Sequence, residues 1–425
     1  MVSQLLVNPH PQIRHVVVLM LENRSFDHLL GDFSRIDPSC EGIAPAGAPP
    51  RSNSVRGQTF VQQPWPAGQD TSMWQRDAKG QALAFDPPHE WPNVWAQLAI
   101  SQGQAQMSGF AASADAAYAD ILPTPARDDA LAKLMACIPF GANPAADPLP
   151  ALQGLARNFC VCDHWFASVP GPTWVNRFFA LMGSAHGRLS MPADWQDAAS
   201  GVSTFLRQVC EPSIFTQMDQ RQLAHRVYSD GRVPLAYMVK GAGEHCSIAD
   251  FVRDAATDAL PSLAWIEPGY GLGSDVDQSQ HPPQALLAGD ALIAQVFNAI
   301  TANPAVWAKT LFVLLYDEHG GFYDHVAPPA AVAPDAKLPD IAAAASALHR
   351  LRLTVWVCAC RQSWPRPGSS AASTPPTATT TPACWRFCAP ISGSMPNPWA
   401  NAWPRPSTLA MRRSGGRSRA PTWRR

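Results

Sequence analysis

The sequence predicts an α/β fold with a mostly parallel central sheet, and two apolar runs of strand length carry that prediction. Residues Leu311 to Tyr316 contain no charge, and Val16 to Leu21 form a second run of the same kind. Near-continuous apolar runs are typical of strands that are buried on both faces of a parallel sheet. With 425 residues, the chain can bury a large core, as one large α/β domain or as two smaller ones.

Polar side chains follow both runs at the point where each run ends. Asp317 and Glu318 come directly after the later run, and Glu22 and Asn23 come directly after the earlier one. An isolated Asp-Glu pair is more often a polar turn, but two pairs that each contain an acid, at the carboxyl ends of parallel strands, would share one edge, where ligands bind. Buried carboxylates that lie close together repel each other unless a cation is present. Oxygen ligands favour calcium, magnesium or manganese, so we predict one divalent cation here.

A break in the chain precedes another candidate residue. Prolines 170 and 172 flank Gly171, and the apolar residues that follow predict a buried helix with Thr173 at its start. A hydroxyl at this position can be a plain N-cap. The same position also suits phosphate, because free N–H groups and the helix dipole attract an anion. A nearby metal ion can turn a threonine hydroxyl into a nucleophile, so both interpretations remain open on the residues alone.

Two loop histidines complete the candidates that the residues themselves offer. His89 precedes a predicted helix, and His281 precedes a pair of prolines. His281 could contact phosphate or act as general acid for a leaving group. Either histidine could equally be a loop side chain that faces solvent.

Composition excludes several classes of protein and leaves others open. The formal net charge is -1, so we expect no general attraction to nucleic acid or to a membrane surface. No apolar segment is long enough to cross a membrane, and the amino terminus lacks a signal peptide, so we expect a cytoplasmic protein. The 10 cysteines lack the spacing of a metal site and are expected to be reduced structural thiols.

The remaining elements are predicted from local patterns. Residues 31–86 are rich in Pro, Gly, Ser and Gln and are expected to form long functional loops. The other expected elements are helices near 95–100, 130–137, 150–158 and 285–300, and short strands near 159–162 and 262–266.

Three motifs in order resemble the phosphoesterase family that groups bacterial phospholipases C, plant non-specific phospholipases C and a bacterial acid phosphatase. They are Glu-Asn-Arg-Ser-Phe-Asp-His at 22–28, Thr-x-x-Asn-Arg at 173–177, and Asp-Glu-His-Gly-Gly-Phe-Tyr-Asp-His at 317–325. Val175 is one departure, because the family usually has Pro before Asn-Arg. The resemblance covers residues from about 10 to 330 and implies an alkaline-phosphatase-like three-layer α/β/α sandwich.

The resemblance also implies roles for individual side chains. It implies that Thr173 is the nucleophile and passes through a phosphothreonine, and that His89 and His281 are active-site histidines. The implied metal ligands are Glu22, Asn23, Asp317 and Glu318, the implied phosphate contacts are Asn23, Asn176 and Arg177, and His319 and His325 are further candidates without an assigned role. The implied substrate is a small phosphate ester or a phospholipid head group. Two alternatives are a sulfatase-like ester hydrolase and an inactive remnant that binds a divalent metal without turnover.

The last part of the chain differs in composition from the rest. Residues 351–425 contain 11 of the 32 basic residues and six of the 15 Trp, but none of the 33 acidic residues and no Tyr. A basic tail that contacts nucleic acid or a disordered tail would explain the charge, but neither explains the tryptophans. We therefore predict a catalytic domain over 1–350, incomplete at its end, and a tail over 351–425 that is disordered and read out of frame.

The genetic code permits a direct test of that idea. Codons can be chosen for Trp356 to Pro367 that, read one base earlier, give Leu-Gly-Val-Arg-Val-Pro-Ala-Val-Val-Ala-Ser-Pro-Trp. The same shift over Thr379 to Trp385 permits Asp-His-Thr-Ser-Leu-Leu after a codon that can be Tyr. Both strings resemble family segments that are otherwise missing. The hypothesis is a frameshift near Arg350 to Val355, with no stable packing beyond about residue 355.

Overall fold

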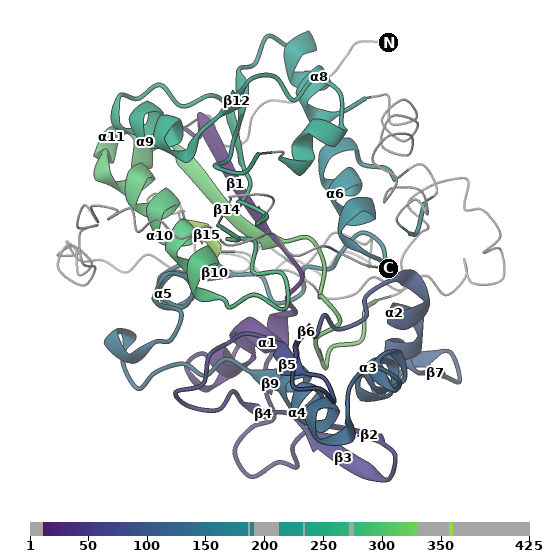
Figure 1. Cartoon of the computed structure of the whole chain (residues 1–425). Helices are drawn as coiled ribbons and strands as arrows, with labels where there is room; N and C mark the ends of the chain where they lie inside the picture. Colours follow the sequence, from purple (N-terminus) through teal and green to yellow (C-terminus); the bar gives the residue numbers. More distant parts are fainter. Residues whose placement is uncertain are drawn as a thin grey trace, which may run out of the picture. The chain divides into compact units, whose positions relative to one another are not determined.

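A central sheet of seven strands organises the structure, in the order β10-β15-β14-β1-β13-β11-β12 (Figure 1). The five strands from β14 to β12 pair in parallel, whereas β15 runs antiparallel to both of its neighbours. The strands are β1 His15–Leu21, β10 Cys160–Val161, β11 His225–Tyr228, β12 His245–Cys246, β13 Leu263–Ile266, β14 Thr310–Tyr316 and β15 Val357–Ala359. The predicted mostly parallel sheet is therefore confirmed.

Strands β1 and β14 are the two apolar runs of the sequence, and they lie side by side. Their pairing runs in register from His15 opposite Thr310 to Leu21 opposite Tyr316. Because the strands are parallel and end together, the residues that follow them emerge at the same edge of the sheet. Strand β13 pairs with the other side of β1, from Val16 opposite Leu263 to Leu19 opposite Ile266.

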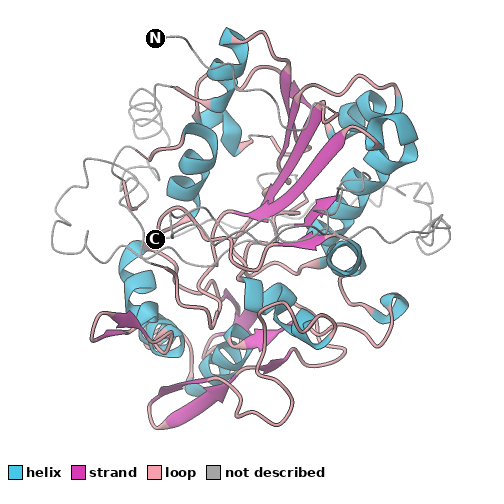
Figure 2. Ribbon diagram, turned by 180° about the vertical axis from the view of Figure 1, so that it is seen from behind, coloured by secondary structure: helices cyan, strands magenta, loops and turns pink. Residues whose placement is uncertain are grey.

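Helices cover both faces of the sheet, as the ribbon in Figure 2 shows. Alternate side chains of β1 point to opposite faces. Val17, Leu19 and Leu21 belong to a core that includes side chains of α5, α9 and α10, whereas Met20 belongs to a second core with α6 and α8. The three-layer α/β/α arrangement is thus confirmed.

The helices include three that the sequence placed well. These are α5, α6 and α10; α6 begins at Thr173 as predicted. The predicted helix near 95–100 was displaced, because α2 begins at Trp91 and ends where Ala99 adopts a φ of 47°. The predicted helix near 130–137 was also displaced, because α4 ends at Leu134. The helices are α1 Phe26–Leu30, α2 Trp91–Leu98, α3 Phe110–Tyr118, α4 Thr124–Leu134, α5 Pro150–Asn158, α6 Thr173–Met182, α8 Ile214–Gln220, α9 Ile248–Ala256, α10 Leu287–Ala302 and α11 Pro304–Trp307.

Several short strands lie within the segment that was predicted to be loop. The expectation of long loops over 31–86 was wrong in part, because β2 and β3 form a hairpin and β5 pairs with β6. Buried Phe60, Trp65 and Met73 anchor this segment in the larger core, so it packs despite its polar composition. The short strands are β2 Ser52–Val55, β3 Gln58–Val61, β4 Gln63–Pro64, β5 Trp74–Arg76, β6 Ala82–Ala84, β7 Ile100–Ser101, β8 Gln104–Ala105 and β9 Ala136–Cys137, with 3₁₀ turns η1 Gly31–Arg35, η2 Pro144–Ala146 and η3 Leu235–Met238.

This computed structural model describes residues 12–185, 188–190, 212–232, 234–271, 276–329 and 357–359. By its contacts the chain divides into Met1–Ala389 and Pro390–Arg425, and every described residue lies in the first unit. Most of the predicted tail over 351–425 lies outside the described residues. The structure departs from the expectation of no packing beyond about 355 at three residues, those of β15, which pair with β10 and β14. Among the described helices, none is both long and apolar enough to span a bilayer.

Candidate active site

The carboxyl ends of β1 and β14 bring the first and third motifs together. The amide N–H of Asp317 donates to the carbonyl of Leu21 at 3.2 Å, which continues the pairing of the two strands by one residue. Glu22 and Asp317 therefore leave the sheet side by side. The sequence prediction that Glu22-Asn23 and Asp317-Glu318 share one edge of the sheet is confirmed.

Asn23 lies at the centre of this edge and contacts three other candidate groups. Its amide N–H donates to Asp317 Oδ1 at 3.1 Å, and its side-chain Oδ1 accepts from the Thr173 hydroxyl at 3.2 Å. Its Nδ2 lies 3.2 Å from Nε2 of His89. The side chain of Asn23 thus connects the predicted nucleophile to a predicted active-site histidine, and its backbone N–H contacts a predicted metal ligand.

Close approach of Gly320 fixes the backbone at Asn23. Asn23 has a φ of 57° and Gly320 a φ of 62°, both in the left-handed region. A Cβ on Gly320 would lie 2.1 Å from the carbonyl oxygen of Asn23. Only glycine fits at this position, because a methyl group would push the two motifs apart.

Replacing Gly320 by alanine is expected to destabilise the fold and weaken divalent-cation binding. The left-handed conformation alone costs an alanine about 1–2 kcal/mol, and the clash with Asn23 adds to that cost. Gly183, with a φ of 71° and no atom of the described residues within 4 Å of its Cβ position, provides the matched control. Urea unfolding and cation titration of both variants test this. Equal losses in the two variants would show that the close approach has no consequence.

A buried arginine from the second motif holds the acidic groups. Arg177, on α6, donates from Nε to Asp317 Oδ2 at 2.9 Å and lies 3.6 Å from Glu22 and 3.5 Å from Glu267. Burial raises the pKa of Glu22 to about 7 and also raises the pKa of Asp317, although Arg177 opposes both shifts. The guanidinium of Arg177 therefore forms ion pairs with these carboxylates, and its predicted contact with phosphate remains a prediction.

Asn176 supports the loop that leads to Thr173. Its Oδ1 accepts from the amide of Val169 at 3.1 Å, and its Nδ2 donates to the carbonyl of Gly171 at 2.8 Å. These bonds hold the turn through Pro172 in place, so that Thr173 starts α6 beside Asn23. The side chain of Asn176 thus bonds to the backbone of this loop. The predicted contact of Asn176 with phosphate also remains a prediction.

His89 is anchored at one ring nitrogen and faces the site with the other. Its Nδ1 lies 2.7 Å from the carbonyl of Pro87, an acceptor, so this nitrogen carries the hydrogen. Its Nε2 lies 3.7 Å from Glu318 Oε1. Burial opposes a charge on this ring, but the carboxylates of Glu318 and Asp86 prevail and raise the pKa of His89 to about 9.

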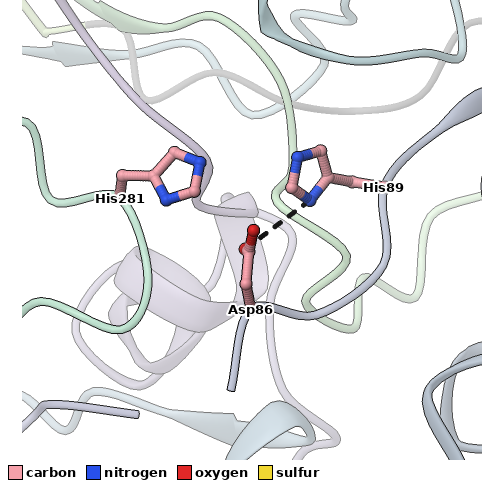
Figure 3. Close-up of side chains that lie close together, drawn as sticks. All are labelled: Asp86, His89 and His281. Carbon is pink, nitrogen blue, oxygen red and sulfur yellow. Dashed lines mark ion pairs between the residues drawn. The ribbon is translucent and has the colours of Figure 1, made fainter. Parts of the chain in front are cut away.

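His281 lies opposite His89 and is anchored in the same way. Its Nδ1 lies 2.5 Å from the carbonyl of Pro282, and the two imidazole rings are 5.9 Å apart between centroids. Figure 3 shows Asp86 between the two rings, 3.8 Å from Nδ1 of His89. Burial opposes a charge on His281, whereas Asp86 and Glu22 raise its pKa. The structure thus brings both predicted histidines together.

The predicted metal ligands fit a hard divalent cation by their chemistry. Glu22, Asp317 and Glu318 are buried together, and Arg177 and His89 supply the neighbouring positive charge. Glu318 Oε2 accepts from the amide of Gly320 at 2.7 Å, but its buried Oε1 has no hydrogen-bond partner among the residues that the structure describes. An orphaned buried carboxylate oxygen within an oxygen donor set is what a calcium- or magnesium-type ion satisfies.

The four predicted ligands nevertheless do not form a closed coordination sphere. Among the described residues, two groups of His, Asp and Glu bring ligand atoms within 4.8 Å of one another: Asp86 with His89 and His281, and Asp27 with Asp324 and His325. The carboxylates that are predicted to bind the metal, those of Glu22, Asp317 and Glu318, belong to neither group.

The two histidines without an assigned role have separate surroundings. His319 is buried between Gln97 Oε1, at 2.7 Å from Nε2, and Glu318 Oε2, at 3.1 Å from Nδ1, so it supports a predicted metal ligand. His325 contacts Asp27 at 2.8 Å and Glu41 at 3.2 Å. It joins the third motif to Asp27 of the first.

Comparison with known proteins assigns this chain to a family. The model of the phosphoesterase family matches residues 13–340. The chain belongs to the phosphoesterase family.

Relatives in this family carry phospholipase names. Non-specific phospholipase C6 of Arabidopsis thaliana is 32% identical over 332 residues, which covers 75% of this chain and 55% of the relative. Phospholipase C B of Mycobacterium tuberculosis is 26% identical over 369 residues, covering 75% of this chain and 60% of the relative. This phosphoesterase chain therefore spans little more than half the length of the curated relatives it matches.

The structure adds residues that the sequence did not single out. Glu267 follows β13 as Glu22 follows β1, and its carboxylate contacts Arg177 and the indole N–H of Trp265 at 2.9 Å. The rule that identified Glu22 and Asp317, an acid at the end of a buried strand, would have found it. Asp86 had no comparable signal, because loops alone place it between the histidines.

Proposed function

We propose that this phosphoesterase hydrolyses phosphate esters with Thr173 as nucleophile. The observation that carries the proposal is the contact of the Thr173 hydroxyl with Asn23 Oδ1 at 3.2 Å, at the first residue of α6 and beside the carboxyl edge of the sheet. A phosphoryl group placed there meets the free N–H groups of the helix and a hydroxyl in reach of its phosphorus.

The side chains divide the work of the reaction. Asn23 orients the Thr173 hydroxyl, and the neighbouring carboxylates would hold a divalent cation. When bound, that cation neutralises phosphoryl oxygens and favours the ionised hydroxyl. Thr173 loses its hydroxyl proton to solvent, its oxygen attacks the phosphorus in line, the bond from phosphorus to the alcohol oxygen breaks, and a phosphothreonine results.

The two histidines are placed to transfer protons to the departing alcohol and from the water that follows. Both rings hold Nδ1 on a backbone carbonyl, so each would reach the substrate through Nε2, which in His89 also lies 3.2 Å from Nδ2 of Asn23. Because neighbouring carboxylates favour the protonated rings, His281 can give its proton to the leaving oxygen. Water then hydrolyses the phosphothreonine and regenerates the hydroxyl.

Assays on matched esters test the reaction and its class. The full chain is expected to release p-nitrophenol from p-nitrophenyl phosphate or from its diester, and the ratio of the two rates shows whether monoesters or diesters are preferred. Faster release from p-nitrophenyl sulfate would favour a sulfatase-like hydrolase. Cation binding without turnover of any ester would mark an inactive remnant.

Removal of divalent cations is expected to abolish turnover. Dialysis against EDTA should lower the rate on p-nitrophenyl phosphate by on the order of a hundredfold or more, because the buried carboxylates would then repel the substrate. Addition of calcium, magnesium or manganese to separate samples should restore it and identify the preferred ion. Full activity after chelation would contradict the role given to the carboxylate edge.

A further inference from the structure

Arg24 is a buried cation that the proposed reaction does not use. Its side chain is fully buried, and among the described residues no carboxylate oxygen lies within 4.0 Å of its guanidinium. Burial lowers the pKa of Arg24 to about 9. A buried charge without a counter-ion is costly, and an apolar side chain of similar volume usually stabilises a fold better. Its presence therefore calls for a role other than stability.

The guanidinium holds both ends of the loop that carries His281. Nε donates to the carbonyl of Gln280 at 2.7 Å, and Nη2 donates to the carbonyl of Gln284 at 3.0 Å. These two carbonyls flank His281 on either side in the chain. A planar guanidinium with two fixed donors holds such a pair more rigidly than an ammonium group can.

Two further contacts fix Arg24 itself. Nη1 lies 3.2 Å from Nε2 of His28, and the guanidinium lies over the ring of Phe322 at 4.6 Å. These residues belong to the first and third motifs. The loop of His281 is therefore fastened to the same two motifs that carry the predicted metal ligands.

Gln280 fixes the loop from its other side. It is buried, has a φ of 67°, and donates from Nε2 to the carbonyl of Leu286 at 2.7 Å. The hydroxyl of Tyr316, the residue before Asp317, donates to its Oε1. A Cβ on Gly289 would lie 2.3 Å from Cγ of Gln280, so the side chain of Gln280 occupies space that is available only because residue 289 is glycine.

We propose that Arg24 is a positioning residue that places the His281 imidazole for proton transfer to the leaving group. The proposal rests on the proposed function in one respect, the role of His281 as general acid. Tyr316 supports the same loop through Gln280. The segments at the ends of β1 and β14 thus set the position of the His281 imidazole as well as that of the predicted cation site.

Leaving-group dependence separates this role from a structural one. An alkyl ester such as glycerol phosphate needs a proton on its leaving oxygen, whereas p-nitrophenolate leaves without one. Arg24→Lys in the full chain is expected to lower kcat on the alkyl ester about ten- to a hundredfold, with a much smaller change on p-nitrophenyl phosphate. Combined with His281→Ala, it is expected to cause no further loss, because both changes remove one function.

Hydrogen exchange supplies a readout that does not need activity. Amides of residues 278–286 are expected to exchange faster in Arg24→Lys, and Tyr316→Phe, which removes one hydroxyl, is expected to show the same pattern more weakly. Arg157→Lys is the matched control, because Arg157 also donates to a backbone carbonyl, that of Gly141 at 3.0 Å, and lies over a ring, that of Phe140 at 5.1 Å. The control should change neither the ratio of rates nor the exchange of this loop.

The possible outcomes separate the two proposals. Equal losses on both esters, a further loss in the double variant, or unchanged exchange over 278–286 would overturn the role of Arg24. If the unaltered chain turns over neither ester, the proposed function fails, and the exchange rates still decide whether Arg24 holds the loop. If Arg24→Lys does not fold, Tyr316→Phe carries the same test.

Discussion

Replacing Thr173 by alanine is expected to lower kcat on phosphate esters by on the order of 10³-fold or more, because the hydroxyl that forms the covalent intermediate is gone. Divalent-cation binding should largely remain, since the buried carboxylates are untouched. Rates on p-nitrophenyl phosphate and calorimetric titration with the activating cation measure the two quantities. Thr173→Ser, which keeps a hydroxyl, should retain part of the activity.

The control for this prediction is a threonine with a purely structural hydroxyl. Thr216 on α8 exchanges hydrogen bonds with Ser213 in a capping box, so its alanine variant is expected to lose about 1 kcal/mol of stability and no turnover. Full activity in Thr173→Ala would remove the assigned nucleophile, whatever the behaviour of Thr216→Ala. Lost cation binding in Thr173→Ala would instead show that the hydroxyl is needed to assemble the site.

Sequencing of independent DNA from the codon for Ala345 to that for Cys360 is expected to show one base gained or lost. The family model ends at residue 340, and the change in composition begins shortly after it. The corrected gene should encode Leu-Gly-Val-Arg-Val-Pro in place of the segment that includes β15. A longer strand rich in valine beside β14 would bury more apolar surface than three residues do.

Expression of both versions tests the consequence for the protein. We expect the corrected chain to accumulate several-fold more in soluble form and to be more active, because marginal stability governs abundance. An unchanged DNA sequence would contradict a sequencing error as the cause of the frameshift and would mean that the gene itself is shifted. Equal yield and activity of the two versions would show that the segment after residue 350 matters little.

The sequence predicted the parts of the site that depend on regular structure. β1 and β14 are long apolar runs, and their parallel pairing alone places Glu22 beside Asp317. Thr173 could be placed because prolines and an apolar pattern mark the start of α6. Local rules were sufficient here because each residue lies within one or two positions of an element end.

The parts that escaped prediction depend on contacts between distant loops. Arg24 was visible as a motif residue, but its carbonyl acceptors on Gln280 and Gln284 lie more than 250 positions away, and no local pattern encodes such a pairing. Asp86 likewise gains its place from the fold of the loop before α2. The predicted helix near 130–137 was displaced for another reason, since α4 starts earlier, where Pro123 and Pro125 favour a helix start.

The order of strands also determines when the site can form during synthesis. Asn23 and Asp317 are 294 positions apart in the chain and meet through one hydrogen bond, from the backbone N–H of Asn23 to the side-chain carboxylate of Asp317. The first motif leaves the ribosome long before its partner strand exists, so it has no acidic neighbours with which to capture a cation. Contacts of such long range form late in folding. The proposed hydrolysis of phosphate esters would therefore begin only after β14 has inserted beside β1. A nascent chain that stops before residue 317 would lack Asp317 and Glu318 and would have no activity.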